Sequence, residues 1–207
     1  MRLYVPWSAA FSEAWAAYRD GSIPVGAAFV DGTEQVRYRG RNQVFSPQSG
    51  SMPLQHTRLA HAEMNVLAQA IPADRLYEGI LYTTLEPCAM CVGAAVVCGI
   101  RHIRYAAMDG STGASGLLTA HPFLASKNVK LEGPEAALGA ASLVLMTDWI
   151  LREDSATAGR TLDAYRAQDA RAVDLAQEWF RAGRLQAMAQ AGVSSDALLA
   201  EITSALR

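Results

Sequence analysis

The chain has 207 residues, of which 51% are hydrophobic and 18% are charged, and its formal net charge is −2. This composition excludes the disordered class, and the near-neutral charge does not indicate a nucleic-acid partner, although a local basic groove would suffice for one. No apolar run reaches the roughly 18–20 residues that a membrane span needs, so we expect a cytoplasmic protein without a membrane partner.

Hydrophobic periodicity predicts alternating helices and strands in the first half of the chain. In chain order we expect a helix at 7–19, strands at 24–30 and 35–41 with a turn at Asp31 and Gly32, a loop at 43–56, a helix at 58–70, a strand at 79–85, a helix at 88–98 and a strand at 100–107. Arg37, Arg39 and Arg41 alternate onto one face of the second strand. We interpret them as a solvated face near a sheet edge rather than as a phosphate-binding stripe.

The second half of the chain has a mostly helical pattern. A polar, Gly-rich loop at 109–116 precedes a short strand at 129–131 and an amphipathic helix at 134–151, with Pro134 in its first turn. Residues 152–207 show no strand pattern, and Ser195 is expected to cap their last helix. Strands separated by helices predict an α/β fold with a partly parallel sheet. We divide the chain into a domain of residues 1–152 and a helical extension of residues 153–207.

Two of the three cysteines, Cys88 and Cys91, lie in the stretch LEPCAMC. A reducing compartment disfavours a disulfide between them, which leaves a redox dithiol or a pair of metal ligands. In the first turn of a helix both sulfurs would share one face, and the helix N-terminus favours the thiolate form, which suits zinc. Cys98 lies about two turns further on, too far to reach the same ion, and we interpret it as a buried small residue.

The tripeptide His61-Ala62-Glu63 offers a third metal ligand in addition to the two cysteines. A lone histidine at a helix start is commonly a cap or a surface residue, but Glu63 adds a carboxylate that can sit beside a metal ion without binding it. His61, Cys88 and Cys91 would leave one tetrahedral position open, which is typical of catalytic zinc. A zinc-stabilised binding module and a dithiol redox protein stay as alternatives. The first has no use for Glu63, and the second does not explain His61.

His61-x-Glu63, followed after 23 intervening residues by Pro87-Cys88-x-x-Cys91, resembles the zinc-dependent deaminases of nucleobases and nucleosides. The blocks that resemble the tRNA adenosine deaminase and guanine deaminase branch are PVGAAFV (24–30), GRNQ (40–43), LAHAEMNVL (59–67), LYTTLEPCAMCVGA (81–94), AAMDGSTGASG (106–116) and LMTDWILR (145–152). The resemblance covers roughly residues 5–152. It implies the cytidine deaminase-like fold, a three-layer α/β/α sandwich around a mixed five-stranded sheet, so that residues 1–152 would be the deaminase domain.

The resemblance also implies a mechanism and a set of site residues. Zinc hydroxide would attack the ring carbon that carries the exocyclic amine, and Glu63 would shuttle protons to the ring nitrogen and to the leaving ammonia. His61, Cys88 and Cys91 would hold the zinc. Substrate binding is assigned to Asn42, Ala62, Glu86 and Asp109, where Glu86 would orient the site. The alternative for Asn42 is a turn residue, and the alternative for Glu86 is an ordinary carboxylate at the end of a strand.

The substrate is predicted less sharply than the reaction. LEPCAMC and DGSTGASG favour the purine and tRNA branch, whereas HAEMN, with Asn65, also resembles deoxycytidylate deaminases. The approach QHTRLA and a C-terminal segment that is not basic depart from a typical tRNA deaminase. We therefore expect a free, purine-leaning nucleobase or nucleoside, covered by a loop at 43–58. A tRNA adenosine is the alternative, and a cytosine or deoxycytidylate-type substrate is third. The resemblance also implies a homodimer.

Overall fold

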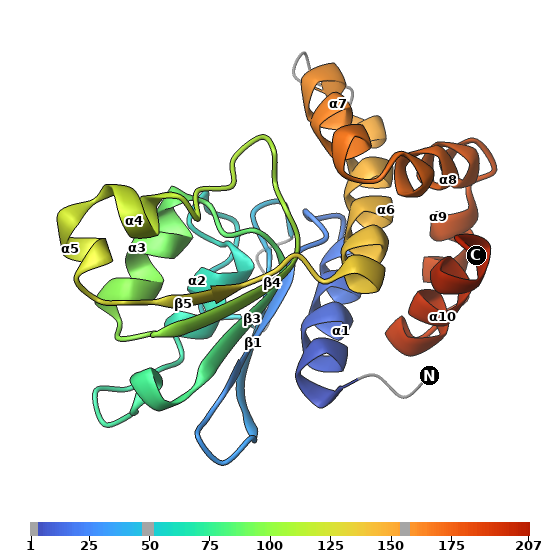
Figure 1. Ribbon diagram of the computed structural model, residues 1–207. Helices are drawn as coiled ribbons and strands as arrows, with labels where there is room; N and C mark the ends of the chain where they lie inside the picture. The colour runs from blue at the N-terminus through green and yellow to red at the C-terminus, as the bar shows by residue number, and fades with distance from the viewer. Residues whose placement is uncertain (1–3, 47–51, 154–157) are drawn as a thin grey trace.

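A mixed five-stranded sheet forms the centre of the structure (Figure 1). The computed structural model describes residues 4–46, 52–153 and 158–207. The strands run in the order β2-β1-β3-β4-β5. Strand β1 is antiparallel to both of its neighbours, and β3, β4 and β5 are parallel. Their bounds are β1 Gly26–Val30, β2 Val36–Arg41, β3 Ile80–Leu85, β4 His102–Ala107 and β5 Lys130–Glu132. The α/β class and the mixed five-stranded sheet are confirmed.

Helices cover both faces of the sheet and complete three layers (Figure 1). Helices α1 (Val5–Arg19) and α6 (Ala136–Glu153) lie on one face, and α2 (Ala62–Leu67) and α3 (Ala89–Val97) lie on the other. The 3₁₀ turn Leu76–Glu78 precedes β3. Two short helices that were not predicted, α4 (Leu117–Ala120) and α5 (Pro122–Ala125), lie beside α3. Within the described ranges, no helix has the length and apolarity needed to cross a membrane.

Two glycines let helices lie directly on the sheet. A Cβ atom on Gly26 of β1 would fall 2.0 Å from the carbonyl oxygen of Ala10 in α1. A Cβ atom on Gly40 of β2 would fall 2.2 Å from the carbonyl oxygen of Ala62, the first residue of α2. Both obstructing atoms belong to helix backbone and cannot swing aside. The two glycines therefore hold α1 and the start of α2 close against the strands.

The edge strand β2 carries the three alternating arginines. Arg37 and Arg39 are exposed, which confirms their interpretation as a solvated face at the sheet edge. Arg41 is only partly exposed, since it lies 3.4 Å from a carboxylate oxygen of Glu13 and 3.3 Å from one of Asp20. Its charge is thus matched within the protein.

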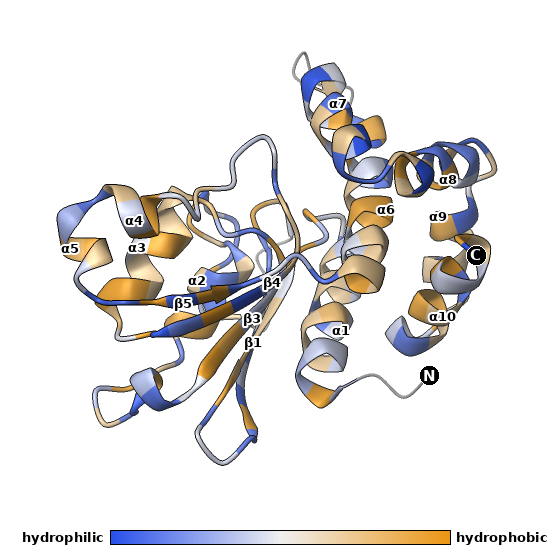
Figure 2. Cartoon of the chain, in the orientation of Figure 1, coloured by the Kyte–Doolittle hydropathy of each residue, from blue (hydrophilic) through white to orange (hydrophobic). Residues whose placement is uncertain are grey.

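Residues 158–207 form four helices that pack against the core. They are α7 (Ala158–Gln168), α8 (Ala170–Arg181), α9 (Arg184–Gln190) and α10 (Ser195–Ala205). Helix α8 buries Ala172, Val173, Ala176 and Trp179 along one face and packs on α6, while hydrophilic residues occupy much of the rest of the helix (Figure 2). The predicted helical extension is confirmed. The division into domains at residue 152 stays a prediction.

The last helix of the extension lies beside the first helix of the core. The indole Nε1 of Trp15 in α1 donates to the carbonyl oxygen of Val193 at 2.7 Å, and Ser8 Oγ donates to a carboxylate oxygen of Asp196 at 3.0 Å. One hydrophobic cluster runs through both parts of the chain, from Trp15 to buried side chains of α10 such as Ile202. The extension therefore completes the core of the fold.

The helix predicted at 58–70 is shorter in the structure, and Pro134 lies outside α6. Helix α2 begins only at Ala62, because His61 has extended backbone dihedrals (φ −74°, ψ 157°). Helix α6 begins at Ala136, two residues after Pro134, so the prediction for that proline was wrong.

Two further local predictions were also wrong. Ser194 rather than Ser195 caps α10, since the Ser194 side chain accepts a hydrogen bond from the Ala197 N–H group. Cys98 is exposed, because it follows the end of α3, whose last residue, Val97, is itself exposed.

Replacing Gly26 by alanine should lower the free energy of unfolding by about 3 kcal/mol, because the new methyl group overlaps the backbone of α1. Gly159→Ala in α7 is the control. An added Cβ there meets nothing within 4 Å, and the change should stay within about 1 kcal/mol. Urea denaturation measures both variants. Equal stability of the two would contradict the close contact between α1 and the sheet.

Candidate active site

Three potential metal ligands meet beside the carboxyl end of β3. His61 immediately precedes α2, Cys88 precedes α3, and Cys91 lies in the first turn of α3. His61 Nδ1 is 3.6 Å from each sulfur, and the two sulfurs are 3.6 Å apart. Tetrahedral zinc with ordinary Zn–N and Zn–S bonds would set these separations at about 3.6 and 3.8 Å. The three side chains therefore fit zinc, and no fourth His, Cys, Asp or Glu joins the group among the described residues.

The two sulfurs already share a negative charge before an ion binds. Hydrogen bonds from Cys91 and from His61 lower the pKa of the Cys88 thiol to about 3, against the opposing effect of its burial. The hydrogen bond to Cys88 and burial raise the pKa of the Cys91 thiol. One thiolate is thus available at neutral pH, and the thiolate is the form of cysteine that ligates metals.

Glu63 lies buried next to this group, with 3% of its surface exposed. One carboxylate oxygen, Oε1, accepts a hydrogen bond from Thr83 Oγ1 at 3.0 Å, and the other, Oε2, lies 3.4 Å from Cys91 Sγ. Burial raises the pKa of Glu63 above its ordinary value, so the carboxyl group takes up a proton more readily there than in water. Thr83 was not predicted as a site residue. A polar residue in the apolar strand β3 is the signal that could have found it.

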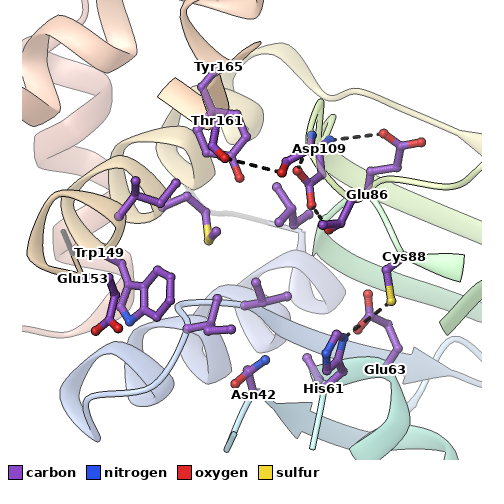
Figure 3. Close-up of a pocket in the computed structure, with 18 of the residues that line it drawn as sticks. Asn42, His61, Glu63, Glu86, Cys88, Asp109, Trp149, Glu153, Thr161 and Tyr165 are labelled. Carbon is purple, nitrogen blue, oxygen red and sulfur yellow. Dashed lines mark hydrogen bonds between the residues drawn. The ribbon is translucent and has the colours of Figure 1, made fainter. Parts of the chain in front are cut away.

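A cavity of about 330 Å³ opens above His61, Glu63 and Cys88 (Figure 3). All four residues predicted to bind substrate, Asn42, Ala62, Glu86 and Asp109, line this cavity together with His61 and Cys88. The site lies where the carboxyl ends of β3 and β4 meet, next to the point at which the sheet changes from antiparallel to parallel pairing. Open α/β sheets commonly bind their ligands in such a crevice.

Asn42 presents a hydrogen-bond donor to the cavity. Its Oδ1 atom accepts from Ser22 Oγ at 2.8 Å and from the Val44 N–H group at 3.0 Å. These two contacts orient the amide, so its Nδ2 group points toward the cavity (Figure 3). A ring nitrogen or carbonyl oxygen of a ligand could accept from it.

The carboxylate of Glu86 is engaged by the protein itself. One oxygen accepts from the Asp109 N–H group at 3.1 Å, and the other accepts from the N–H and hydroxyl groups of Ser115. Asp109 in turn accepts from Ser111 N–H at 3.0 Å and from Thr112 Oγ1 at 2.5 Å. These contacts favour an orienting role for Glu86, which ties the 109–116 loop to the residues just before Cys88.

Helices α6 and α7 form a side of the cavity that was not predicted. Trp149 and Glu153 line it from α6, and Thr161 and Tyr165 line it from α7 (Figure 3). The loop at 43–58 was expected to cover the ligand. Part of that loop lies outside the described residues, and its described positions, 43–46 and 52–58, do not line the cavity. Asn65 does not line the cavity either, because its side chain bonds Leu54 N–H and the Arg41 carbonyl oxygen.

The cavity lining combines apolar side chains with acidic ones. Glu63, Glu86, Asp109 and Glu153 contribute carboxyl groups, and none of the described residues that line the cavity is lysine or arginine. Phosphate groups in proteins are bound by cationic side chains and charge-assisted N–H donors. This lining therefore favours a ligand without a phosphate group.

Comparison with known proteins identifies the family. A model of the cytidine and deoxycytidylate deaminase zinc-binding region matches residues 6–107. The tRNA-specific adenosine deaminase of Rickettsia bellii is 31% identical over 108 residues, which cover 51% of this chain and 70% of that protein. The chain therefore belongs to the family of zinc-dependent, cytidine and deoxycytidylate deaminase-like proteins, as the sequence motifs predicted.

Its relatives differ in the substrate that they act on. The cytosine deaminase of Candida albicans is 29% identical over 96 residues, which cover 45% of this chain and 59% of that protein. The chain spans between 53% and 64% of the length of this protein and of the tRNA-specific adenosine deaminases of Bacillus subtilis and Haemophilus influenzae. The structure of guanine deaminase from Nitrosomonas europaea superposes with a TM-score of 0.52 at 20% identity, over 72% of this chain and 84% of that one. This last likeness shows the shared fold.

Zinc content distinguishes the cysteines. Cys91→Ala should lose bound zinc almost completely, because two remaining ligands are too few for a tight site. Cys98→Ala should keep about one zinc ion per chain, as the unaltered protein does, since Cys98 lies outside the group of ligands. Metal analysis after dialysis measures both variants. Loss of zinc from Cys98→Ala, or its retention by Cys91→Ala, would contradict the proposed set of ligands.

Proposed function

We propose that this chain is a zinc-dependent hydrolytic deaminase that acts on a free nucleobase or nucleoside, with a preference for purines. The observation that carries the proposal is the cavity beside the metal ligands, which is small, acidic and without lysine or arginine among its described lining residues. Its volume of about 330 Å³ lies near the lower end of the range for ligand pockets, about 300–1,000 Å³.

In this proposal His61, Cys88 and Cys91 hold the ion. Bound zinc supplies the acidity that makes a water molecule a strong nucleophile at neutral pH. Glu63 accepts one proton of the attacking water and delivers it to the ring nitrogen. It then takes the second proton from the new hydroxyl group, which becomes the carbonyl oxygen, and passes that proton to the exocyclic amine, which leaves as ammonia. The Thr83 hydroxyl holds one oxygen of Glu63 in place, so that the carboxyl group keeps its orientation through these transfers.

Replacing Glu63 by glutamine should lower kcat by at least about a thousandfold, because an amide cannot carry the proton between the sites. Zinc should stay bound, since Glu63 is not one of the ligands. The control is Glu78→Gln, the same change at an exposed position, which should leave kcat unaltered. Ammonia release and metal analysis are measured on the same samples. Substantial turnover by a zinc-loaded Glu63→Gln protein would remove Glu63 from the mechanism.

The composition of the cavity also supports an uncharged substrate over a nucleotide or an RNA. Among the described lining residues, a phosphate in the cavity would meet carboxyl groups such as those of Glu153 and Asp109 and no lysine or arginine side chain. The Nδ2 group of Asn42 offers a donor to a ring nitrogen or carbonyl oxygen, and the partly buried indole of Trp149 offers a flat apolar surface. Both groups suit a heterocyclic base.

Adenosine in tRNA is the second candidate. It is favoured by sequence identity, because the tRNA-specific adenosine deaminases of Bacillus subtilis and Haemophilus influenzae are 37% and 38% identical over the matched residues. A cytosine-type substrate is the third, and the cytosine deaminase of Candida albicans supports it. A homodimer and a cytoplasmic location, both expected from the sequence, remain predictions.

A substrate panel separates these candidates. Ammonia release is measured with guanine, adenine, guanosine, adenosine, cytosine, cytidine and an anticodon stem-loop RNA. A free purine base or nucleoside should give a kcat/KM at least about a hundredfold above that of the RNA, because the acidic cavity repels phosphate. Turnover of the stem-loop alone would overturn the proposal in favour of the tRNA candidate, and turnover of cytosine alone would support the third candidate.

A further inference from the structure

Helix α7 of the extension sits on the loop that carries Asp109. The Gln168 side chain donates from Nε2 to the carbonyl oxygen of Met108 at 3.0 Å, and the hydroxyl groups of Thr161 and Ser111 lie 3.4 Å apart. These contacts join positions that are 60 and 50 residues apart in the chain. They fix one face of α7 over residues 108–111.

The closest approach between the two segments is at Gly110. A Cβ atom on Gly110 would fall 2.7 Å from the Cβ atom of Ala164, whereas the next atom, the Cα of Ala164, would be 3.7 Å away. Gly110 is not among the glycines with positive φ, so its backbone conformation does not require glycine. The missing side chain instead makes room for Ala164. The position of α7 on the loop therefore requires glycine at residue 110 and a small residue at position 164.

The same helix contributes two side chains to the cavity. Thr161 and Tyr165 point from α7 toward Asp109, across the cavity from His61 and Glu63 (Figure 3). Tyr165 is 1% exposed and belongs to the main hydrophobic cluster. Burial, with a contribution from the Asp109 charge, raises its pKa, so the phenol stays neutral. Thr161 and Tyr165 thus present neutral side chains to the cavity.

We infer that helix α7, seated through the Gly110–Ala164 contact, is the wall that restricts this active site to free bases and nucleosides. The inference rests on the proposed function and adds the element that sets substrate size. A base that is part of a nucleotide chain must keep its backbone at the mouth of the pocket while the base enters. Thr161 and Tyr165 line the α7 side of the cavity (Figure 3), so while α7 stays in contact with the loop they take up room there that a nucleotide backbone would otherwise have.

The Gly110–Ala164 contact can be disrupted by one substitution and restored by a second one. Gly110→Ala forces α7 away from the loop, because the two methyl groups cannot both be accommodated. Adding Ala164→Gly to that variant removes the obstructing Cβ atom, and the nearest remaining atom then lies at an ordinary contact distance of 3.7 Å. Ala167→Leu is the control, since residue 167 is exposed on the same helix.

The measured quantity is the ratio of kcat/KM for guanosine 5′-monophosphate to that for guanine, with the adenine pair measured in parallel. Gly110→Ala should raise this ratio at least about tenfold, and the double variant should return to within about twofold of the unaltered protein. Ala167→Leu should not change it. Circular dichroism and zinc content are measured for all four proteins, and Thr161→Ala, which widens the cavity without adding atoms, should also raise the ratio if Gly110→Ala fails to fold.

The outcomes separate this inference from the proposed function. If the unaltered protein deaminates free bases and the ratio is the same in Gly110→Ala, Thr161→Ala and the double variant, the role of α7 is wrong and the proposed function stands. If the unaltered protein releases no ammonia from any base or nucleoside while it binds zinc, both are overturned. A ratio that rises in Gly110→Ala but does not return in the double variant would also contradict the contact as the determinant.

Discussion

The geometry of the site depends on where two helices begin. His61 and Cys88 are each the last extended residue before a helix, and their side chains meet only because α2 and α3 start side by side on the same face of the sheet. The start of α2 is set by the contact between the Ala62 backbone and Gly40. Each residue of an α-helix turns the side chain by about 100° and advances it by about 1.5 Å. A shift of α2 by one residue would therefore take both His61 and Glu63 out of reach of the cysteines.

Hydrogen bonds and packing also link the segment that carries the proposed ligand Cys88 to helix α7 on the opposite side of the cavity. Glu86 joins the segment before Cys88 to the loop of Asp109 and Ser115, and that loop supports α7 through Gly110. The proposed metal ligands, the 109–116 loop and helix α7 are thus connected by direct contacts. The preorganisation that catalysis requires can arise from such rigid support, because every side chain around the reacting atoms is held by another.

Much of the site could be predicted because its signals are local. Cys88 and Cys91 are three residues apart, and His61 and Glu63 are two apart, so their common purpose is visible in short stretches of sequence. The wall formed by α7 has no such signal. Ala164 and Gly110 are ordinary small residues, and nothing in either segment of sequence shows that they contact each other beside the cavity. Thr83, which holds Glu63, has only a weak signal, because its hydroxyl is followed by that of Thr84 in the same buried strand and the sequence does not show which of the two contacts Glu63.

The boundaries of elements were harder to predict than their existence. The pattern at 58–70 indicated a helix of thirteen residues, but local turns take up both of its ends and leave only Ala62–Leu67 in α2. Cys98 was expected to be buried because free cysteines are among the most buried residues, yet α3 ends one residue before it and the side chain is exposed. In both cases the periodicity continued past the point at which tertiary contacts end the helix.

The pairing of α1 with α10 has a consequence for how the protein is made. Trp15 and Val193 are joined by a hydrogen bond although 178 residues separate them. During synthesis α1 leaves the ribosome long before α10 is made. The apolar surfaces of α1 and α6 that pack against the C-terminal helices are therefore exposed to solvent until those helices are synthesised. Contacts of such large sequence separation slow folding, and transiently exposed apolar surface promotes aggregation. Newly synthesised chains should therefore depend on chaperones until the final helix is complete.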